Sequence, residues 1–258
     1  MMEKIKVNYT HDNSVAQIIL DDGKGNVLDH IMMDELLEVL NSYKDNNHIK
    51  IIIFEGAGKH FSFGASVDEH QKDMAATMLK CFHQLFFTLR DLAIPTLAKI
   101  SGQCLGGGME LAIMCNFLFA DKTAKLGQPE LVLGVFPPPA SIILPEKIGL
   151  ARAEELLLTG KTISAERAKI IGLLNDVYED KAALETEVNL FIEQFILPKS
   201  ASSLRYGVKA SRVKFNHILG NFLPMLEQLY VSSLMNTQDA NEGINSFLEK
   251  RKPVWQDC

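Results

Sequence analysis

The chain has 258 residues, 47% of them hydrophobic and 22% charged, which is an ordinary composition for a soluble globular protein with a sizeable core. A formal net charge of −6 argues against a nucleic-acid-binding surface, because such surfaces are normally basic. The charged start MMEKIKVNYT lacks the apolar segment of a signal peptide, and the longest apolar stretch, residues 111–120, is too short to span a membrane.

The spacing of cysteine and histidine indicates neither a disulfide framework nor a metal site. The four cysteines form no CxxC pair, and the seven histidines show no HExxH spacing. We therefore expect free thiols, no metal ion and a cytoplasmic location.

The first 125 residues alternate predicted strands and helices. A helix is expected to begin after Asp29, a second lies within residues 68–92 and stops before Pro95, and a third spans residues 106–115. Strands are expected at residues 5–9, 15–20, 50–54, 97–100 and 117–120. This alternation predicts βαβ units and a parallel sheet that is covered by helices.

After Pro145 the pattern becomes helical. Helices are expected at residues 151–158, 164–171, 182–196 and 201–235. The sequence contains no internal repeat and no low-complexity linker. We therefore expect one αβ core, residues 1–195, followed by a helical C-terminal region, residues 196–258.

The stretch QCLGGGMEL, residues 103–111, places three glycines just before Met109 and Glu110, at the start of an apolar helix. A Gly-rich turn at the start of a helix can present free backbone N–H groups toward one point. The spacing matches neither a P-loop nor a dinucleotide-binding turn, and a Glu at this place would repel phosphate. Taken alone, the stretch also fits a close-packing turn with no catalytic role.

A second acidic residue, Glu130, lies in KLGQPELVLGVFPPPAS, residues 125–141, among apolar residues and prolines. Such a Glu is either a loop charge that faces solvent or a carboxyl group with a raised pKa that is suited to proton transfer. Two carboxyl groups that face one cavity, Glu110 and Glu130, can act on a water molecule as general base and general acid.

The loop GKHFSFGASVDEH, residues 58–70, leads from a predicted strand into the second helix. It can offer a further free N–H near Ala65, or it is an ordinary loop in which Ser66 or Asp68 caps the helix. Two N–H donors and two carboxylates would suit a reaction in which charge develops on a carbonyl oxygen while protons move nearby. Spacing alone does not show that the four groups converge.

Four segments, FSFGAS, QCLGGGMEL, GQPE and EGINSFLEKRK, resemble in order and spacing the signature segments of the enoyl-CoA hydratase/isomerase (crotonase) superfamily, over nearly the whole chain. The resemblance implies an α/β fold, a crotonase-like spiral of ββα units with a helical C-terminal trimerisation region, assembled as a trimer or a dimer of trimers. It also implies an acyl-CoA substrate whose thioester oxygen binds two backbone N–H groups, and no further cofactor.

Position by position, the resemblance places the oxyanion-binding N–H groups on Ala65 and Gly107 and the catalytic carboxyl groups on Glu110 and Glu130. Contacts to the acyl group or to CoA are implied for a further set of residues: His60, Phe61, Phe63, Gly64, Ser66, Val67, Phe136, Phe247 and Lys250. Of these, Phe247 and Lys250 match positions that contact the CoA of a neighbouring subunit.

Two departures from the family pattern bear on the substrate. Ser66 stands where family members usually have Asp, and the segment VFPPPAS, residues 135–141, replaces a glycine-rich stretch. Prolines fix φ and remove N–H donors, so the wall beside Glu130 should be stiffer and differently shaped than one built for a straight acyl chain.

Within the family, LGVFPPPAS, SASSLR and FLEKR most resemble a subgroup of hydratases that act on a cyclic conjugated dienoyl-CoA in anaerobic aromatic degradation. The expected function is therefore a lyase that adds water to such a ring. The nearest alternative is a general enoyl-CoA hydratase or isomerase of fatty-acid or amino-acid breakdown, and another is a non-catalytic acyl-CoA-binding oligomer. Neither a nucleic acid nor a membrane is an expected partner.

Overall fold

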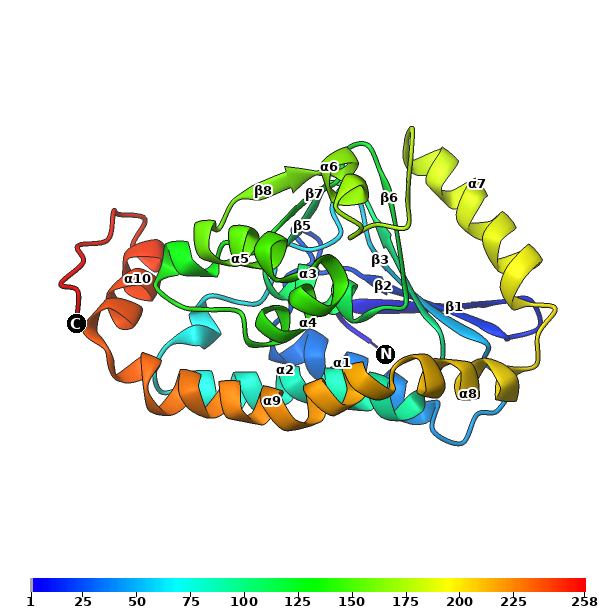
Figure 1. Cartoon of the computed structure of the whole chain (residues 1–258), viewed down its shortest axis with the longest axis horizontal. Coiled ribbons are helices and arrows are strands. Elements are labelled where there is room, and N and C mark those ends of the chain that lie inside the picture. The colour runs from blue at the N-terminus through cyan, green and yellow to red at the C-terminus, as the bar shows by residue number, and fades with distance from the viewer. Residues whose placement is uncertain (1) are drawn as a thin grey trace.

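The computed structural model describes residues 2–258 and is built around a six-stranded sheet (Figure 1). In spatial order its strands are β1 (Ile5–Thr10), β2 (Val15–Leu20), β3 (Ile51–Gly56), β4 (Thr96–Ile100), β6 (Phe117–Asp121) and β9 (Asp176–Tyr178). β1 and β2 pair antiparallel, and the other neighbours pair parallel. The predicted parallel sheet is confirmed, with one antiparallel strand at its edge.

A second, smaller sheet carries the loops that later form the site. It contains β5 (Gln103–Leu105), β7 (Lys125–Gly127) and β8 (Thr162–Ser164), in that order. β5 pairs parallel with β7, and β7 pairs antiparallel with β8. These strands and β9 have three residues each, too few for a periodic pattern, and the sequence did not predict them.

The α-helices are α1 (His30–Ser42), α2 (Ala75–Leu92), α3 (Gly107–Met114), α4 (Pro138–Ile148), α5 (Leu150–Thr159), α6 (Ala165–Ile170), α7 (Lys181–Phe191), α8 (Ala201–Ser211), α9 (Val213–Ser232) and α10 (Gln238–Leu248). Shorter helical turns are η1 (Asp68–His70), η2 (Glu130–Leu133), η3 (Ile192–Ile196) and η4 (Leu234–Asn236).

Apolar side chains bury both faces of the main sheet. On β3, Ile52 and Phe54 belong to the main core, which also contains the buried faces of α1 and α2. Ile51 and Ile53 point the other way and pack with residues of α7 and η3. A strand that is buried on both faces has a continuous apolar sequence, which explains the run KIIIF at residues 50–54.

Two predicted helix caps can be compared with the structure. The side chain of Asp29 accepts a hydrogen bond from Met32 N–H at 3.1 Å, as expected for the first residue before a helix. By contrast, α2 begins only at Ala75, and neither Ser66 nor Asp68 caps it. Asp68 instead opens the short turn η1, so the proposed cap of α2 is wrong.

The helical second half begins earlier than predicted and is more divided. α4 starts at Pro138 instead of after Pro145, because prolines are compatible with the first turn of a helix, where the N–H groups have no partner within the helix. The predicted helix over residues 201–235 is interrupted at Arg212, whose guanidinium donates to Met114 O at 2.8 Å and ties this corner to α3.

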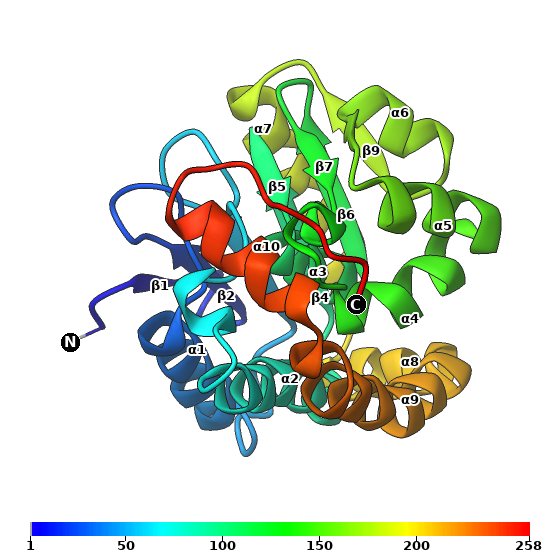
Figure 2. The same ribbon diagram turned by 90° about the vertical axis from the view of Figure 1, so that its left-hand side faces the viewer.

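The C-terminal helices lie against the core and close one end of it. α9 packs on α2 and α4, and α10 packs on η1 and η2 (Figures 1 and 2). The last residues fold back over α10, where Gln238 N–H donates to Cys258 O at 2.9 Å. Figure 2 shows α10 and this terminal segment in front of the edge where β5 and β7 end.

Candidate active site

Two glycine turns from different parts of the chain meet at the start of α3. Gly64 has a φ of +110°, and a Cβ atom there would lie 3.4 Å from the Gly107 nitrogen. A Cβ atom on Gly107 would lie 3.0 Å from the Ala65 nitrogen. The two backbone segments therefore approach more closely than most residues with a side chain would permit.

The N–H groups of Ala65 and Gly107 are free donors. Within residues 2–258 neither donates a hydrogen bond, whereas the neighbouring Ser66 and Gly106 N–H groups donate to backbone carbonyls, each at 3.0 Å. Gly107 is the first residue of α3, so its N–H also belongs to the positive end of that helix. Two such donors side by side can bind a carbonyl oxygen on which negative charge develops.

The Glu110 carboxyl group lies at the N-terminus of α4. Glu110 is 4% exposed, and its Oε1 accepts a hydrogen bond from Ala140 N–H at 2.9 Å. Pro138 and Pro139, the first two residues of α4, have no N–H. Ala140 therefore supplies the first backbone donor of this helix, and the helix dipole favours a negative charge on Glu110.

Glu130 begins η2 and reaches back to the glycine turn of α3. A Cβ atom on Gly106 would lie 2.8 Å from Glu130 Oε1. Gly106 also has a φ of +49° and a ψ of −130°, a conformation that residues with a side chain rarely adopt. Glycine at position 106 thus permits the backbone turn and, because it has no Cβ atom, leaves room for the Glu130 carboxyl group.

The two carboxyl groups influence each other's protonation. Burial raises the pKa of Glu110 well above its usual value and a Glu130 charge raises it further, while the hydrogen bond from Ala140 acts in the opposite direction. Burial also raises the pKa of Glu130, to about 8. Both shifts favour the protonated form, so we infer that the pair retains at least one proton near neutral pH, the proton that a general acid must supply.

Gln128, which sequence reasoning missed, lies beside Glu130 and is fully buried. One polar atom of its amide is 3.0 Å from both carboxyl oxygens of Glu130. An amide NH₂ at this point donates to the ionised carboxylate, and an amide oxygen at the same point accepts from the protonated carboxyl group. The opposite end of the amide faces only hydrogen-bond donors, so the orientation with the NH₂ group toward Glu130 is the one that satisfies both ends.

The raised pKa of Glu130 predicts a specific pH dependence of stability. A carboxyl group whose pKa rises from 4.5 to about 8 on folding takes up a proton, so stability is lost as the pH increases between these values. Between pH 5 and pH 8 the Tm of the wild type should therefore fall by several degrees more than the Tm of Glu130→Gln. This estimate takes a Tm shift of ~2–4 °C for each kcal/mol of stability. Calorimetric melting at both pH values measures this, and parallel Tm profiles would contradict the assigned pKa.

Glu110 and Glu130 line one narrow cavity of about 70 Å³. The predicted residues around it are Phe63, Gly64, Ala65, Val67, Gly107 and Phe136. Sequence reasoning did not assign a site role to several others, namely His70, Phe82, Leu133 and Tyr230. Of these, Phe82 belongs to the predicted apolar stripe of the second helix, while His70 and Tyr230 carried no recognisable signal.

His70 is a neutral side chain at the cavity. Its Nδ1 lies 2.7 Å from Ser66 O, so this nitrogen carries the hydrogen and donates it. Burial lowers the pKa of His70, which keeps the ring uncharged near neutral pH. The bond fixes the backbone of the loop that presents Ala65.

Two predicted contact residues have structural roles. Phe61 is 0% exposed within the main core, and its N–H donates to Ser101 O at 2.9 Å, so the prediction that its side chain contacts the ligand is wrong. His60 Nδ1 accepts a hydrogen bond from Gln103 N–H at 3.0 Å, and its ring packs edge-to-face on Phe63. His60 and Phe61 thus anchor the loop whose tip is Phe63.

Phe247 and Lys250 lie away from this cavity. Phe247 is exposed on α10, and Lys250 follows that helix with a left-handed φ of +55°. Neither belongs to the cavity lining. Their predicted role, contact with the CoA of a neighbouring subunit, stays a prediction.

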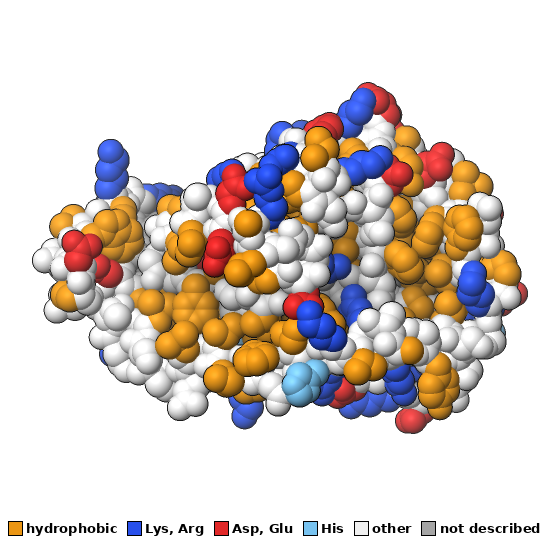
Figure 3. Space-filling view, viewed as in Figure 1, with side chains coloured by type: hydrophobic (Ala, Val, Ile, Leu, Met, Phe, Trp, Pro, Cys, Tyr) orange, Lys and Arg blue, Asp and Glu red, His pale blue; other side chains and the backbone are white. Residues whose placement is uncertain are grey.

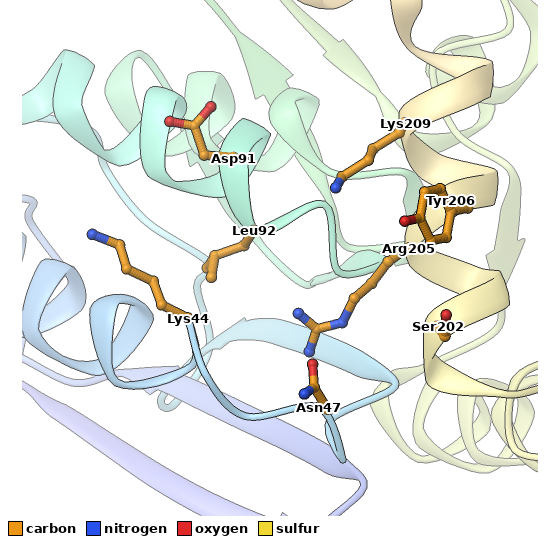
Figure 4. A pocket seen from close by; sticks show the side chains of 8 residues that line it. All are labelled: Lys44, Asn47, Asp91, Leu92, Ser202, Arg205, Tyr206 and Lys209. Carbon is orange, nitrogen blue, oxygen red and sulfur yellow. The ribbon is translucent and has the colours of Figure 1, made fainter.

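A wider depression of about 670 Å³ lies elsewhere, between α8 and the ends of α1 and α2 (Figure 4). Figure 4 shows Arg205 and Lys209 extending into it from α8, opposite Lys44 and Asp91. It shares no residue with the cavity of the two carboxyl groups. Four of its eight lining residues are charged, and we assign no chemistry to it.

Two kinds of feature are absent from residues 2–258. None of the helices in this range combines the length and apolarity that crossing a membrane requires. The range also contains no group of three or more His, Cys, Asp or Glu side chains that is placed to bind a metal ion.

Comparison with known sequences places this geometry in a family. A family model described as enoyl-CoA hydratase/isomerase matches residues 10–258. A cyclohexa-1,5-dienecarbonyl-CoA hydratase of Thauera aromatica is 40% identical over 253 residues, covering 98% of this chain and 97% of the relative. A probable enoyl-CoA hydratase of Mycobacterium bovis is 37% identical over 234 residues, 88% of each chain.

Solved structures agree with the fold. An enoyl-CoA hydratase from Mycobacterium avium subsp. paratuberculosis superposes with a TM-score of 0.87 at 22% identity and covers 100% of both chains. An enoyl-CoA hydratase from Bacillus anthracis gives a TM-score of 0.78 at 30% identity, covering 98% of this chain and 99% of that one. The predicted crotonase-type α/β fold is thereby confirmed, and the chain belongs to the enoyl-CoA hydratase/isomerase family.

Proposed function

We propose that this protein adds water to cyclohexa-1,5-diene-1-carbonyl-CoA, giving 6-hydroxycyclohex-1-ene-1-carbonyl-CoA, as a step of anaerobic benzoyl-CoA degradation. The observation that carries the proposal is the pair of carboxyl groups, buried Glu110 and partly buried Glu130, in one cavity beside two free N–H donors. The 40% identity to the Thauera aromatica hydratase over nearly the full length of both chains supports the cyclic substrate.

The N–H groups of Ala65 and Gly107 would bind the thioester oxygen. Polarisation of this carbonyl makes C2 of the ring electrophilic, so that the water oxygen forms a bond to C2 and the electrons move into a dienolate. Protonation of the dienolate at C5 leaves one double bond between C1 and C6. After renumbering, this is the 6-hydroxy-1-ene product, and the overall addition is redox-neutral and requires no metal or redox cofactor.

In this proposal Glu110 removes a proton from the attacking water and Glu130 donates the proton to the ring. Burial and the Glu130 charge raise the pKa of Glu110, and the hydrogen bond from Ala140 at the N-terminus of α4 opposes this effect by stabilising the ionised form that a base requires. The pKa of Glu130, raised to about 8 by burial, favours a protonated donor at neutral pH. Because C2 and C5 lie on opposite sides of the ring, two separate carboxyl groups suit this addition better than one.

The walls of the cavity support a flat ring as the acyl group. Phe82, Phe136 and Pro138 line it. These side chains are stiff or planar, and the proline φ angles are fixed. A long flexible acyl chain gains less from such a narrow space than a planar ring does.

A substrate panel tests the proposed function. We expect kcat/KM for the cyclic dienoyl-CoA to exceed that for crotonyl-CoA by about 10- to 200-fold, the range that shape discrimination in an apolar pocket achieves. Loss of the absorbance of the conjugated thioester measures hydration of crotonyl-CoA. The cyclic product keeps one double bond conjugated with the thioester, so chromatographic separation of the dienoyl-CoA from the hydroxyenoyl-CoA measures the other reaction. A preference for crotonyl-CoA would favour a general enoyl-CoA hydratase, and binding of both esters without turnover would indicate a non-catalytic binding protein.

The remaining CoA contacts and the assembly belong to the same proposal. We place the CoA part near His60, Phe63, Ser66 and Val67, with Phe247 and Lys250 supplied by a neighbouring subunit.

Self-association through the C-terminal region 196–258 is supported by exposed apolar residues on α9, namely Phe222, Met225 and Leu229. Figure 3 shows apolar side chains gathered on this part of the surface. Light scattering should give the mass of a trimer or of two trimers, whereas a monomer would contradict it.

A further inference from the structure

Tyr230 lies in the cavity of the two carboxyl groups and has no role in the steps above. It comes from α9, is 1% exposed, and its ring packs edge-to-face on Phe136 with 5.4 Å between the centroids. Both rings line the same cavity as Glu110 and Glu130. Tyr230 therefore contributes to the wall against which an acyl group would lie.

The hydroxyl group of Tyr230 is buried and has no hydrogen-bond partner among residues 2–258. Buried hydroxyl groups are normally hydrogen-bonded, and a Phe at this position would fill the same wall without an unsatisfied polar atom. A buried, unpartnered hydroxyl at the edge of a cavity indicates that its partner enters with the ligand.

The position of Tyr230 is fixed by the helix that carries it. About one turn earlier on α9, Glu227 Oε2 lies 2.6 Å from His83 Nδ1 of α2. The His83 side chain is 1% exposed, so this contact fastens α9 to α2 within the protein. Phe82, the neighbour of His83, lines the cavity as well. The Tyr230 hydroxyl is thus held on a packed helix instead of a mobile loop.

Few acceptors remain for this hydroxyl. The thioester oxygen is assigned to two backbone N–H groups, and a hydrocarbon ring offers no acceptor. Neither Glu110 nor Glu130 is bonded to Tyr230. Burial and both carboxyl groups raise the pKa of Tyr230, so its hydroxyl keeps the proton and acts as a donor. The oxygen of the water that is added is the acceptor that remains.

We propose that the Tyr230 hydroxyl donates a hydrogen bond to the oxygen that is added to the substrate, first as the attacking water and then as the product alcohol. The proposal rests on the proposed function. Tyr230 keeps its own proton throughout: the water loses one proton to a Glu, and the carbon–oxygen bond forms at the ring. Tyr230 thereby orients the water and distinguishes hydroxylated from unhydroxylated acyl groups.

Tyr230→Phe removes only this oxygen atom, and the test compares two ligands that differ only by a hydroxyl group. They are 6-hydroxycyclohex-1-ene-1-carbonyl-CoA and cyclohex-1-ene-1-carbonyl-CoA, titrated by calorimetry in a Glu130→Gln background that slows turnover. We expect Tyr230→Phe to weaken binding of the hydroxylated ester about tenfold and to leave the other unchanged. In the otherwise wild-type enzyme, kcat should fall about 10- to 100-fold with no decrease in Tm.

Tyr43→Phe is the matched control. Tyr43 is also 1% exposed, but its hydroxyl lies 3.1 Å from the Tyr9 hydroxyl, and neither tyrosine lines the cavity. This variant should lose some stability and keep its activity. An unchanged kcat in Tyr230→Phe, or equal weakening of both esters, would overturn the proposal while wild-type activity persists. A wild type inactive on every acyl-CoA tested would instead overturn the proposed function, and this inference with it.

Discussion

Replacing either Glu110 or Glu130 by Gln is expected to lower the hydration rate by about 10²–10⁴-fold, the range typical of a lost general acid or base. Gln has nearly the same shape as Glu but neither takes up nor releases a proton in the working pH range. Both carboxyl groups line one cavity, so the loss of one leaves the other without its complement. The measurement is kcat/KM on the cyclic dienoyl-CoA. Because the two groups act as a unit, the double variant should be little slower than either single variant.

Controls separate this loss of chemistry from loss of folding or binding. Glu154→Gln changes an exposed carboxylate on α5 and should leave the rate unchanged. An unreactive acyl-CoA should still bind to both active-site variants, because the N–H donors at Ala65 and Gly107 are untouched. Near-normal turnover in both Glu110→Gln and Glu130→Gln would contradict the two-carboxylate mechanism.

The parts of the candidate site that could be predicted are encoded by short local segments. The three glycines two positions before Glu110, and the proline directly before Glu130, are visible without any knowledge of the fold. The convergence of Glu110 and Glu130 could not be seen in the sequence, because it depends on β5 and β7, which have three residues each. The pairing of these strands puts Gly106 N–H 3.0 Å from Gly127 O, and so brings the glycine turn beside the Gln128–Glu130 segment.

The errors in the site have a physical cause in backbone alternation. Phe61 and Phe63 were both expected to contact the ligand, yet they flank Ser62, which forms a β-bridge with Cys104. In extended backbone, successive side chains point to opposite sides, whereas residues two apart share a side unless the chain turns. The backbone around Ser62 forms only this isolated bridge and no regular strand, and Phe61 enters the core while Phe63 is 47% exposed. No local pattern reports such a departure from alternation in advance.

Tyr230 illustrates what helical periodicity leaves open. The pattern over residues 201–235 predicted helix, and the buried positions of α9 include Leu219, Leu223 and Tyr230. A tyrosine in such a stripe has the sequence signature of a core aromatic. Which helices pack against α9, and where the hydroxyl ends, are set by tertiary contacts with α2 and α4, which lie far from it in the chain.

Gly106→Ala is expected to lower kcat by about 10²-fold, the size of effect that a displacement of about 1 Å at a catalytic group can have. The added Cβ would lie 2.8 Å from Glu130 Oε1, so the carboxyl group must move. The backbone conformation at position 106 is also unfavourable for alanine, at ~1–3 kcal/mol. Melting should therefore shift down by roughly 3–10 °C, and steady-state kinetics with thermal denaturation measures both effects.

A second glycine separates backbone strain from displacement of the carboxyl group. Gly172 has a φ of +82°, and a Cβ atom added there would meet no other group within 4 Å, so Gly172→Ala introduces strain without a clash. This control should lose stability and keep its kcat. Combining Gly106→Ala with Glu130→Gln then locates the cause: if the glycine acts by giving room to that carboxyl group, the double variant should be no slower than Glu130→Gln alone. A multiplicative loss would mean that Gly106 acts on the N–H donors instead, because Gly106 directly precedes Gly107.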